Sequence, residues 1–392
     1  MRDWQVKSVL CIYFLSVLFF NKVAFLLYGY IVNAILLFVF LIDIKNVRRF
    51  NFGNNIYGFR MLILIFYGLL SLAWTPNFDG SVTHLQVLSV MVANSFIVFY
   101  FLKRYNALNI LVAALLVYSF INCTLALGLP IFNFLENKSV TFRFIGTELN
   151  PNYLAITLIF SILLSLVSLQ GRIVGRSWMF IHSSNIILSL YAILLTGSRK
   201  GILFGFLLVL IYLVINYSFW IPFVRRNILF ILLGLVVLSF MNIEVISSNI
   251  EKPLERVNRM FSSVEGTDNE GSTVSRIMFI REGWKMFQLQ PWFGYGIGSF
   301  SYYFGKYAHN NYIELLFGLG FLGPIIFYSV HYSLLKDCLK HRVGFFIPSF
   351  IFVLLMMDVG LVSYSEKRIM LIFISLIIIV DRLKEERNPI LT

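Results

Sequence analysis

The feature that most constrains this chain is a series of apolar runs that are long enough to cross the hydrocarbon core of a bilayer. A helical crossing needs about 20 apolar residues. Such runs lie near residues 8–20, 23–42, 59–74, 82–102, 107–127, 152–169, 179–196, 201–219, 227–243, 309–335, 344–362 and 368–381. Hydrophobic residues make up 59% of the 392 residues and charged residues 13%, which leaves too little polar surface to cover a soluble globule. The sequence therefore predicts an all-α polytopic membrane protein with about 12 transmembrane helices and excludes a soluble enzyme.

The basic residues predict the orientation of these helices, because cytoplasmic loops carry an excess of lysine and arginine. With a cytoplasmic N-terminus, 18 of the 32 basic residues fall in inner loops and ends, seven in short outer loops and seven in the segment 244–307. We therefore expect both termini inside and this segment outside. The net charge of +13 is then explained by topology and by contact with anionic membrane lipids, and we expect no nucleic-acid partner.

Three segments follow from this topology. Residues 1–243 hold transmembrane helices 1–9, residues 244–307 form an external loop with short helices, and residues 308–392 hold helices 10–12 and a cytoplasmic tail. In the external loop we expect an amphipathic stretch near 251–264 and a helix near 273–289. The second helix has one apolar face, formed by Ile277, Ile280, Trp284 and Phe287.

Three of the predicted helices begin at the outer face with polar or basic residues. They start at Asn150-Pro151-Asn152, at Ser198-Arg199-Lys200-Gly201 and at His309-Asn310-Asn311, with Arg143 shortly before the first start. The N-terminus of a helix offers unpaired N–H groups and a partial positive charge. Together with Arg143, Arg199 and Lys200, the three starts predict a site for a lipid-linked diphosphate at the outer surface. The alternative is that these cations reach lipid phosphates or water and that His309 is an interfacial histidine.

Other motifs carry weaker signals. The run Gly294-Tyr295-Gly296-Ile297-Gly298 follows no predicted strand, so we expect a tight turn and not a dinucleotide-binding loop. The five histidines lack a spacing that favours a metal site, so no metal or cofactor is predicted. Two ionisable residues, His182 and Asp358, fall within predicted spans, where such groups are usually functional. The Gly201-x-x-x-Gly205 spacing allows close helix packing.

The ordered motifs between residues 140 and 330 resemble the bacterial O-antigen ligase and O-antigen polymerase superfamily. Order and spacing make the set specific, although each motif alone is weak. The plan of about 12 spans with a large outer loop before the last three is also similar to this superfamily. The set comprises Arg143, Gly146, Asn150-Pro151-Asn152, Thr196-Gly197-Ser198-Arg199-Lys200-Gly201, Arg276, the run from Pro291 to Phe300, and His309-Asn310-Asn311-Tyr312-Ile313-Glu314.

The resemblance implies a metal-independent, inverting glycosyltransferase of the bacterial inner membrane with its active site facing the periplasm. The donor would be a glycan on undecaprenyl diphosphate. The acceptor would be a second lipid-linked repeat unit in a polymerase, or the lipid A core in a ligase. A chain-length regulator protein is among the partners that the resemblance implies.

The resemblance also implies roles for individual residues. Arg199 and Arg276 would hold the diphosphate, and His309 would assist the acceptor hydroxyl as general base. The spacing along the chain, and not the resemblance, suggests that Glu314 orients His309. This requires an irregular first turn of the helix, because on a regular helix Glu314 shares a face with Asn310. Supporting roles fall to the three asparagines Asn150, Asn152 and Asn310.

Three functions remain open at this point. A polymerase is preferred to a ligase because the external segment of 64 residues, from 244 to 307, is small for gripping a lipid A core. A flippase or transporter of lipid-linked sugars is the competing class. Transporters usually place their polar groups near the membrane midplane, in repeated halves, whereas the polar groups here gather at one face.

Overall fold

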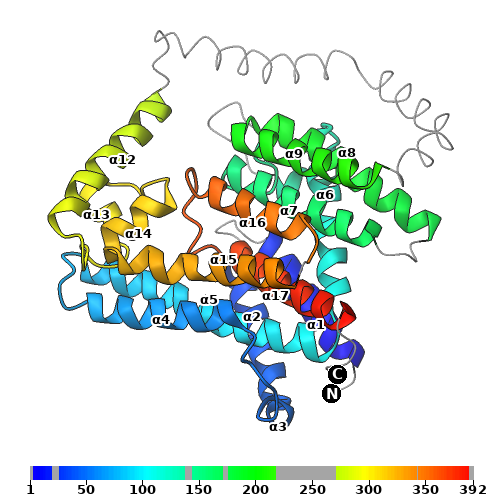
Figure 1. Cartoon of the computed structure of the whole chain (residues 1–392), viewed down its shortest axis with the longest axis horizontal. Helices are drawn as coiled ribbons and strands as arrows, with labels where there is room; N and C mark the ends of the chain where they lie inside the picture. Colours follow the sequence, from blue (N-terminus) through cyan, green and yellow to red (C-terminus); the bar gives the residue numbers. More distant parts are fainter. Residues whose placement is uncertain are drawn as a thin grey trace. The chain divides into compact units, whose positions relative to one another are not determined.

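The computed structural model describes residues 3–19, 26–136, 144–170, 175–217, 271–341 and 343–387. Every regular element in these ranges is a helix (Figure 1). The chain separates into two compact units, one formed by Met1–Tyr118 with Glu270–Thr392 and the other by Ser119–Asn269. We refer to them as unit 1 and unit 2. These units follow from packing, so the three-segment division by membrane topology stays a prediction.

Unit 1 is built around the C-terminal helix α17 (Lys367–Arg387), which is buried on all sides from Arg368 to Asp381. Helix α4 (Ile56–Ser71) packs against α5 (Phe78–Arg104) and α15 (Leu322–Lys340), and α17 packs against α5 (Figure 1). The side chains of Asn55 and Asn77 cap the starts of α4 and α5. The other described helices that lie wholly in this unit are α1 (Asp3–Phe19), α2 (Leu26–Ile42), α3 (Ile44–Val47), α12 (Gly271–Leu289), α13 (Phe300–Phe304), α14 (Asn311–Leu319) and α16 (Phe346–Met357).

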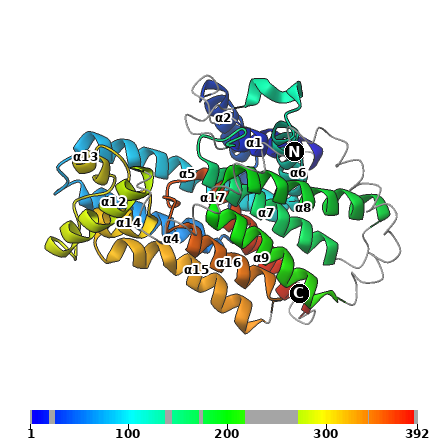
Figure 2. The ribbon, with the colours of Figure 1, turned by 90° about the horizontal axis from the view of Figure 1, so that it is seen from above.

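Unit 2 contains a closely packed group of three helices, α7 (Pro151–Gln170), α8 (Arg176–Thr196) and α9 (Arg199–Ile215). Each contacts the other two (Figure 2). A Cβ atom added to Gly201 of α9 would lie 2.6 Å from the Cβ of Ala155 in α7. The glycine spacing therefore does permit a close helix contact. The unit also contains the short 3-10 helix η2 (Pro130–Leu135) and the end of α6 (Leu108–Ala126), whose residues up to Tyr118 belong to unit 1.

Four helices in the described ranges are long and apolar enough to cross a membrane: Phe78–Arg104, Leu108–Ala126, Pro151–Leu169 and Ser177–Thr196. Three shorter apolar helices cover Leu27–Ile42, Ile56–Ser71 and Phe346–Met357. The total of about 12 spans and the external position of residues 244–307 stay predictions. The expected span at 227–243 and the amphipathic stretch at 251–264 lie outside the described residues.

Two expected helices at the end of the chain are wrong in detail. The run 309–335 is two helices, α14 and α15, because the chain turns at Gly320 with φ +60° and ψ −155°. A Cβ atom there would lie 2.3 Å from the carbonyl oxygen of Trp292, so only glycine permits this close approach. The run 344–362 forms a helix only from Phe346 to Met357, and an irregular loop with four successive buried residues, 361–364, follows it.

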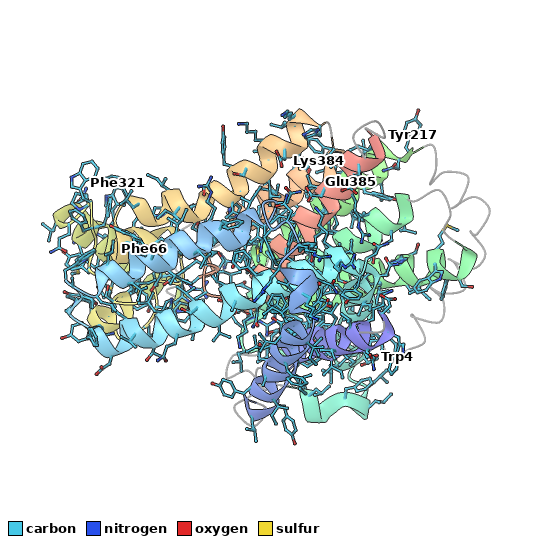
Figure 3. All side chains as sticks on the ribbon, turned by 90° about the horizontal axis from the view of Figure 1, so that it is seen from below. Trp4, Phe66, Tyr217, Phe321, Lys384 and Glu385 are labelled. Carbon is cyan, nitrogen blue, oxygen red and sulfur yellow. The ribbon has the colours of Figure 1, made fainter. Side chains whose placement is uncertain are left out.

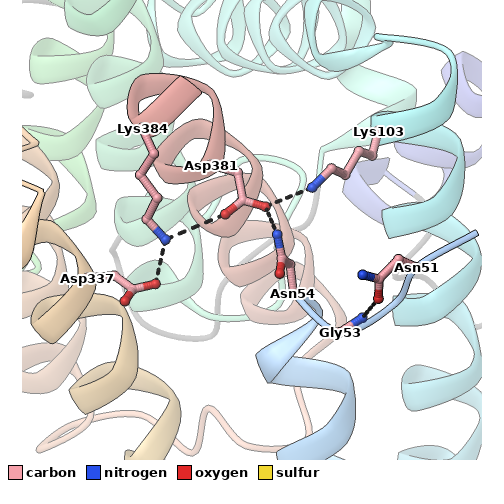
Figure 4. A network of polar contacts seen from close by, with 7 residues as sticks. All are labelled: Asn51, Gly53, Asn54, Lys103, Asp337, Asp381 and Lys384. Carbon is pink, nitrogen blue, oxygen red and sulfur yellow. Dashed lines mark hydrogen bonds and ion pairs between the residues drawn. The ribbon is translucent and has the colours of Figure 1, made fainter. Parts of the chain in front are cut away.

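Charged and amide side chains tie four elements together at one end of unit 1 (Figure 4). The Oδ2 atom of Asp381 accepts hydrogen bonds from Asn54 at 2.8 Å and from Lys103 at 3.0 Å. Lys384 donates to Asp337 at 2.6 Å and lies 3.6 Å from Asp381 Oδ1. The C-terminal parts of α5, α15 and α17 therefore meet the loop before α4. The charge pattern predicts that this end faces the cytoplasm.

Candidate active site

The glycine-rich loop that follows α12 fixes the opposite end of unit 1. The backbone N–H of Gly296 donates to the carbonyl of Gly318 in α14 at 2.8 Å. Ile297 bonds Ser71 through its N–H at 3.1 Å and Ser81 through its carbonyl at 2.6 Å. Gly296 has φ +95°, and a Cβ atom on it would lie 2.4 Å from Thr75 Cβ. The loop is thus a turn that holds α14 on the ends of α4 and α5, which explains its glycines.

His309 lies in the loop just before α14, in a backbone conformation that few residues adopt. Its φ is +54°, in the left-handed region, which residues other than glycine adopt only at an energetic cost. The imidazole is half-buried, and the centre of its ring lies 3.9 Å from that of Tyr307. Residues held in such conformations gather at functional sites when their surroundings over-determine them.

The two neighbours of His309 are both fixed by hydrogen bonds to α14. The carboxylate of the buried Glu314 accepts a hydrogen bond from the backbone N–H of Ala308 at 2.7 Å. Asn310 caps α14 by accepting from the N–H of Ile313 at 3.1 Å and donates to the carbonyl of Val359 at 3.5 Å. Glu314 therefore holds the backbone next to His309, and these bonds keep the histidine in its strained conformation.

Helix α12 brings Arg276 to the same part of unit 1. The helix packs on α14, and a Cβ atom on Gly283 would lie 2.6 Å from the side chain of Ile313. Burial and, to a smaller extent, the positive charges of Arg276 and Lys306 together lower the pKa of His309 to about 4. The imidazole is therefore neutral near pH 7 and can accept a proton.

The apolar face predicted for α12 is partly wrong. Phe287 is buried and Ile280 is half-buried, as expected, but Ile277 is 61% exposed and Trp284 is 45% exposed. Gly283 lies against α14 although it has no side chain, because a Cβ atom on it would lie 2.6 Å from Ile313 and 2.9 Å from Phe300. A pattern of apolar side chains does not reveal a helix contact that is centred on glycine.

A buried polar cluster around Asn311 anchors the start of α14. The sequence motifs did not indicate these residues as a group. Asn311 donates to the hydroxyl of Tyr328 at 2.9 Å and to Asp358 Oδ2 at 3.3 Å. Its Oδ1 accepts from the N–H groups of Ser363 at 2.9 Å and Tyr364 at 3.2 Å. Asn311 therefore satisfies the backbone of the irregular loop after α16. Asp358 was expected to be functional only as an ionisable residue within a predicted span.

Unit 2 brings together the first turns of α7 and α9. Ser198 caps α9 by accepting from the N–H of Gly201 at 3.3 Å, and its hydroxyl donates to Asn152 Oδ1 at 2.7 Å. Asn150 accepts from the N–H of Asn152 at 2.8 Å. Arg199 is exposed at the first position of α9 and Lys200 is half-buried beside it. Two of the three predicted helix starts thus adjoin, with two cations at one of them.

The predicted site residues fall into two groups. Arg276, His309, Asn310 and Glu314 belong to unit 1, and Asn150, Asn152, Arg199 and Lys200 belong to unit 2. Arg143 lies outside the described residues. His182, in α8, contacts Ser165 Oγ at 3.2 Å through Nδ1. Within the ranges that the structure covers, His, Cys, Asp and Glu side chains do not gather in threes that could hold a metal ion.

Residues 184–328 match the family model that is described as O-antigen ligase. The match confirms the superfamily that the motifs predicted. No curated protein matches the chain. The matched range includes Arg199, Lys200, Arg276, His309, Asn310 and Glu314 of the predicted site residues, and it begins after Arg143, Asn150 and Asn152.

Proposed function

We propose that this chain, which carries an O-antigen ligase domain over residues 184–328, transfers a glycan from undecaprenyl diphosphate to a sugar hydroxyl at the outer face of the bacterial inner membrane. The observation that carries the proposal is the state of His309. Its imidazole is neutral, half-buried and held in a strained conformation, and Arg276 contributes positive charge close enough to lower its pKa. A base can accept the proton of the attacking hydroxyl, and a cation near it can stabilise the departing diphosphate.

The chemistry assigns one task to each of these two residues. The acceptor oxygen attacks the anomeric carbon of the donor, and a new carbon–oxygen bond forms as the bond from that carbon to the diphosphate breaks. The electron pair of the broken bond leaves with the diphosphate, and the hydroxyl proton passes to His309. Arg276 stabilises the charge that develops on the leaving group, and its guanidinium can donate two parallel hydrogen bonds to it. Attack from the face opposite the diphosphate inverts the anomeric configuration.

For Arg199 in unit 2 we propose contact with the donor diphosphate. It extends from the N-terminus of α9, next to the start of α7, so its charge adds to the partial positive charges of two helix ends. Lys200 would add to the same charge. The diphosphate role of Arg143 is proposed from the sequence motifs alone. A hydrogen bond to a charged group contributes about 1.5–3 kcal/mol, and lysine keeps the charge without the planar fork.

A graded loss of donor binding tests this role. Arg199→Ala should lower donor binding about 10- to 100-fold, and Arg199→Lys should recover part of it. Binding of a labelled undecaprenyl-diphosphate glycan to the purified variants measures both effects. Wild-type affinity in a normally folded Arg199→Ala protein would remove Arg199 from the site.

Within this chemistry we propose a polymerase, which joins lipid-linked repeat units, because of the small segment at 244–307. The description of the matched family favours a ligase as the second candidate. A deletion strain separates the two. Loss of a polymerase leaves single repeat units on the lipid A core, whereas loss of a ligase leaves long polymer on the carrier lipid. Complementation with wild type and with His309→Asn assigns the phenotype to this chain.

A further inference from the structure

Helix α12 and the loop after it present large apolar side chains that the described parts of the chain leave exposed. Leu289 is 77% exposed and Trp292 is 68% exposed. Ile277, Trp284 and Phe293 are also exposed. Isolated exposed apolar residues are normal on a protein surface, but a contiguous group of this size marks an interaction surface.

Aromatic contacts connect these side chains to residues at the outer ends of α4 and α15, so that they form one continuous surface. Phe293 contacts Trp74, which follows α4, with ring centres 5.7 Å apart. Trp292 contacts Phe321, which precedes α15, at 5.8 Å. Phe287 bridges Phe321 and Trp284 at 5.0 Å and 5.2 Å. We name Trp74, Trp284, Trp292, Phe293 and Phe321 the aromatic platform.

The platform continues into the side chains that would face lipid tails. Phe66 of α4 and Ile325 of α15 are exposed, and both belong to runs predicted to cross the membrane, 59–74 and 309–335. Figure 3 shows Phe66 and Phe321 toward one end of unit 1 and Lys384 toward the other. The platform therefore lies where an apolar helix surface ends at the outer face, which is the level that tryptophan and tyrosine favour in membrane proteins.

Basic residues of α12 lie next to the platform. Arg281 and Lys285 are exposed and are four residues apart, so they share a face of the helix. Lys285 pairs with Glu282 at 2.8 Å in an exposed ion pair. Trp284 lies on the same helix as these cations. Tryptophan is enriched at the headgroup level of a membrane, and lysine and arginine contact the anionic lipids there.

We propose that α12 and the loop Pro291–Phe293 lie in the outer headgroup layer of the bilayer, with the aromatic platform at the boundary of the acyl chains. The occupant of this surface is phospholipid. The sequence predicts an external loop with short helices at residues 244–307, and the proposal places the second half of this loop at the membrane surface. If the proposed function holds, this seating puts Arg276, on the same helix, at the depth of a lipid-linked diphosphate.

Fluorescence quenching by brominated lipids tests the seating directly. Five tryptophans are replaced by phenylalanine and Trp292 is kept, and the protein is reconstituted into phosphatidylcholine–phosphatidylglycerol vesicles. Bromine near the top of the acyl chains should quench Trp292 more strongly than bromine placed deep, and aqueous acrylamide should quench it weakly. The matched control carries Glu282→Trp as the single tryptophan, on the other flank of α12, and should show the opposite sensitivities.

Two results would overturn the proposal. Strong acrylamide quenching without bromine quenching would put Trp292 in water, and protection from both quenchers would show that protein covers it. If the five-fold variant fails to fold, the wild type is compared with the single variants Trp292→Phe and Trp284→Phe, each of which should lose part of the bromine-quenched signal. No readout is activity, so a negative result leaves the proposed glycosyl transfer untouched.

Discussion

His309 combines a left-handed backbone with a neutral imidazole, and both properties follow from local contacts. Glu314 and Asn310 fix the residues on either side of it, while burial and two nearby cations keep the ring unprotonated. A base of this kind is ready to accept a proton before substrate binds. The anionic donor would offset the nearby positive charges, so the basicity of the imidazole would rise when the diphosphate is bound.

This electrostatic coupling gives a pH prediction. The neutral imidazole is the active form, so kcat/KM should be constant from about pH 8 to pH 5 and should fall as the pH drops through the pKa of His309, about 4. Removing a neighbouring positive charge raises that pKa. Lys306→Gln and Arg276→Gln should therefore move the acid limb to higher pH, whereas Lys285→Gln should leave it in place. An acid limb near pH 6.5 in the wild type, the ordinary pKa of histidine, would contradict the assignment.

At the scale of single residues, the sequence predicts where a residue lies in a helix better than it predicts its hydrogen-bond partners. The position of His309 and Asn310 at a helix start could be foreseen from capping preferences. The bond from Glu314 to Ala308 could not, because it depends on the path of the preceding loop. The role of Asn311 depends on a loop more than 50 residues away in sequence, and no local signal indicates such a partner.

The close contact between α7 and α9 depends on a single glycine, Gly201, which leaves space for Ala155. Gly201→Ala would bring its Cβ into Ala155, and overpacking of this kind costs about 1–3 kcal/mol. We expect a lower unfolding temperature in detergent. The double variant Gly201→Ala with Ala155→Gly should recover stability because it restores the space.

A matched control for this test is Gly175→Ala at the start of α8. A Cβ atom there meets nothing within 4 Å among the described residues, so the unfolding temperature should not fall. Equal destabilisation by both alanine substitutions would mean that helix packing at Gly201 is not the cause.

Helices as elements were largely predictable, because the apolar runs are long and their polar boundaries are distinct. The exceptions have particular causes. Gly320 ends α14 within the apolar run 309–335, where the backbone of Trp292 approaches it closely. Gly283 lies against α14, so that part of the apolar face of α12 stays exposed. In both cases a glycine permits a contact with a segment that is remote in sequence, which a periodic pattern does not encode.

At the scale of unit 1, the Asp381 network joins elements from both ends of the sequence. Asp381→Asn should lower the free energy of unfolding by about 1–3 kcal/mol, because Lys103 and Lys384 lose a charged partner in a partly buried setting. Glu282→Gln, in the exposed pair with Lys285, is the control and should cost about 0–1 kcal/mol. Thermal unfolding in one detergent compares the two. A smaller effect for Asp381→Asn than for the control would show that the network does not hold the unit together.

The pairing of elements in this unit could not be read from the sequence. Composition and charge predict helices and an orientation, but they do not say that Asn54 meets Asp381 across 327 positions. The division into two compact units likewise depends on tertiary packing, and the motifs do not indicate it. Each unit contains some of the candidate residues.

The central claim is tested most directly by glycosyl transfer with purified protein. Wild type in lipid nanodiscs receives an undecaprenyl-diphosphate repeat unit, with a chelator and without ATP, and both polymer and released undecaprenyl diphosphate are measured. We predict transfer by the wild type. His309→Asn tolerates the left-handed backbone and should lower turnover about 10²- to 10⁴-fold while donor binding changes little. Wild-type turnover in a folded His309→Asn protein would contradict the account. So would the absence of transfer by the wild type both to the repeat unit and to lipid A core supplied as the acceptor.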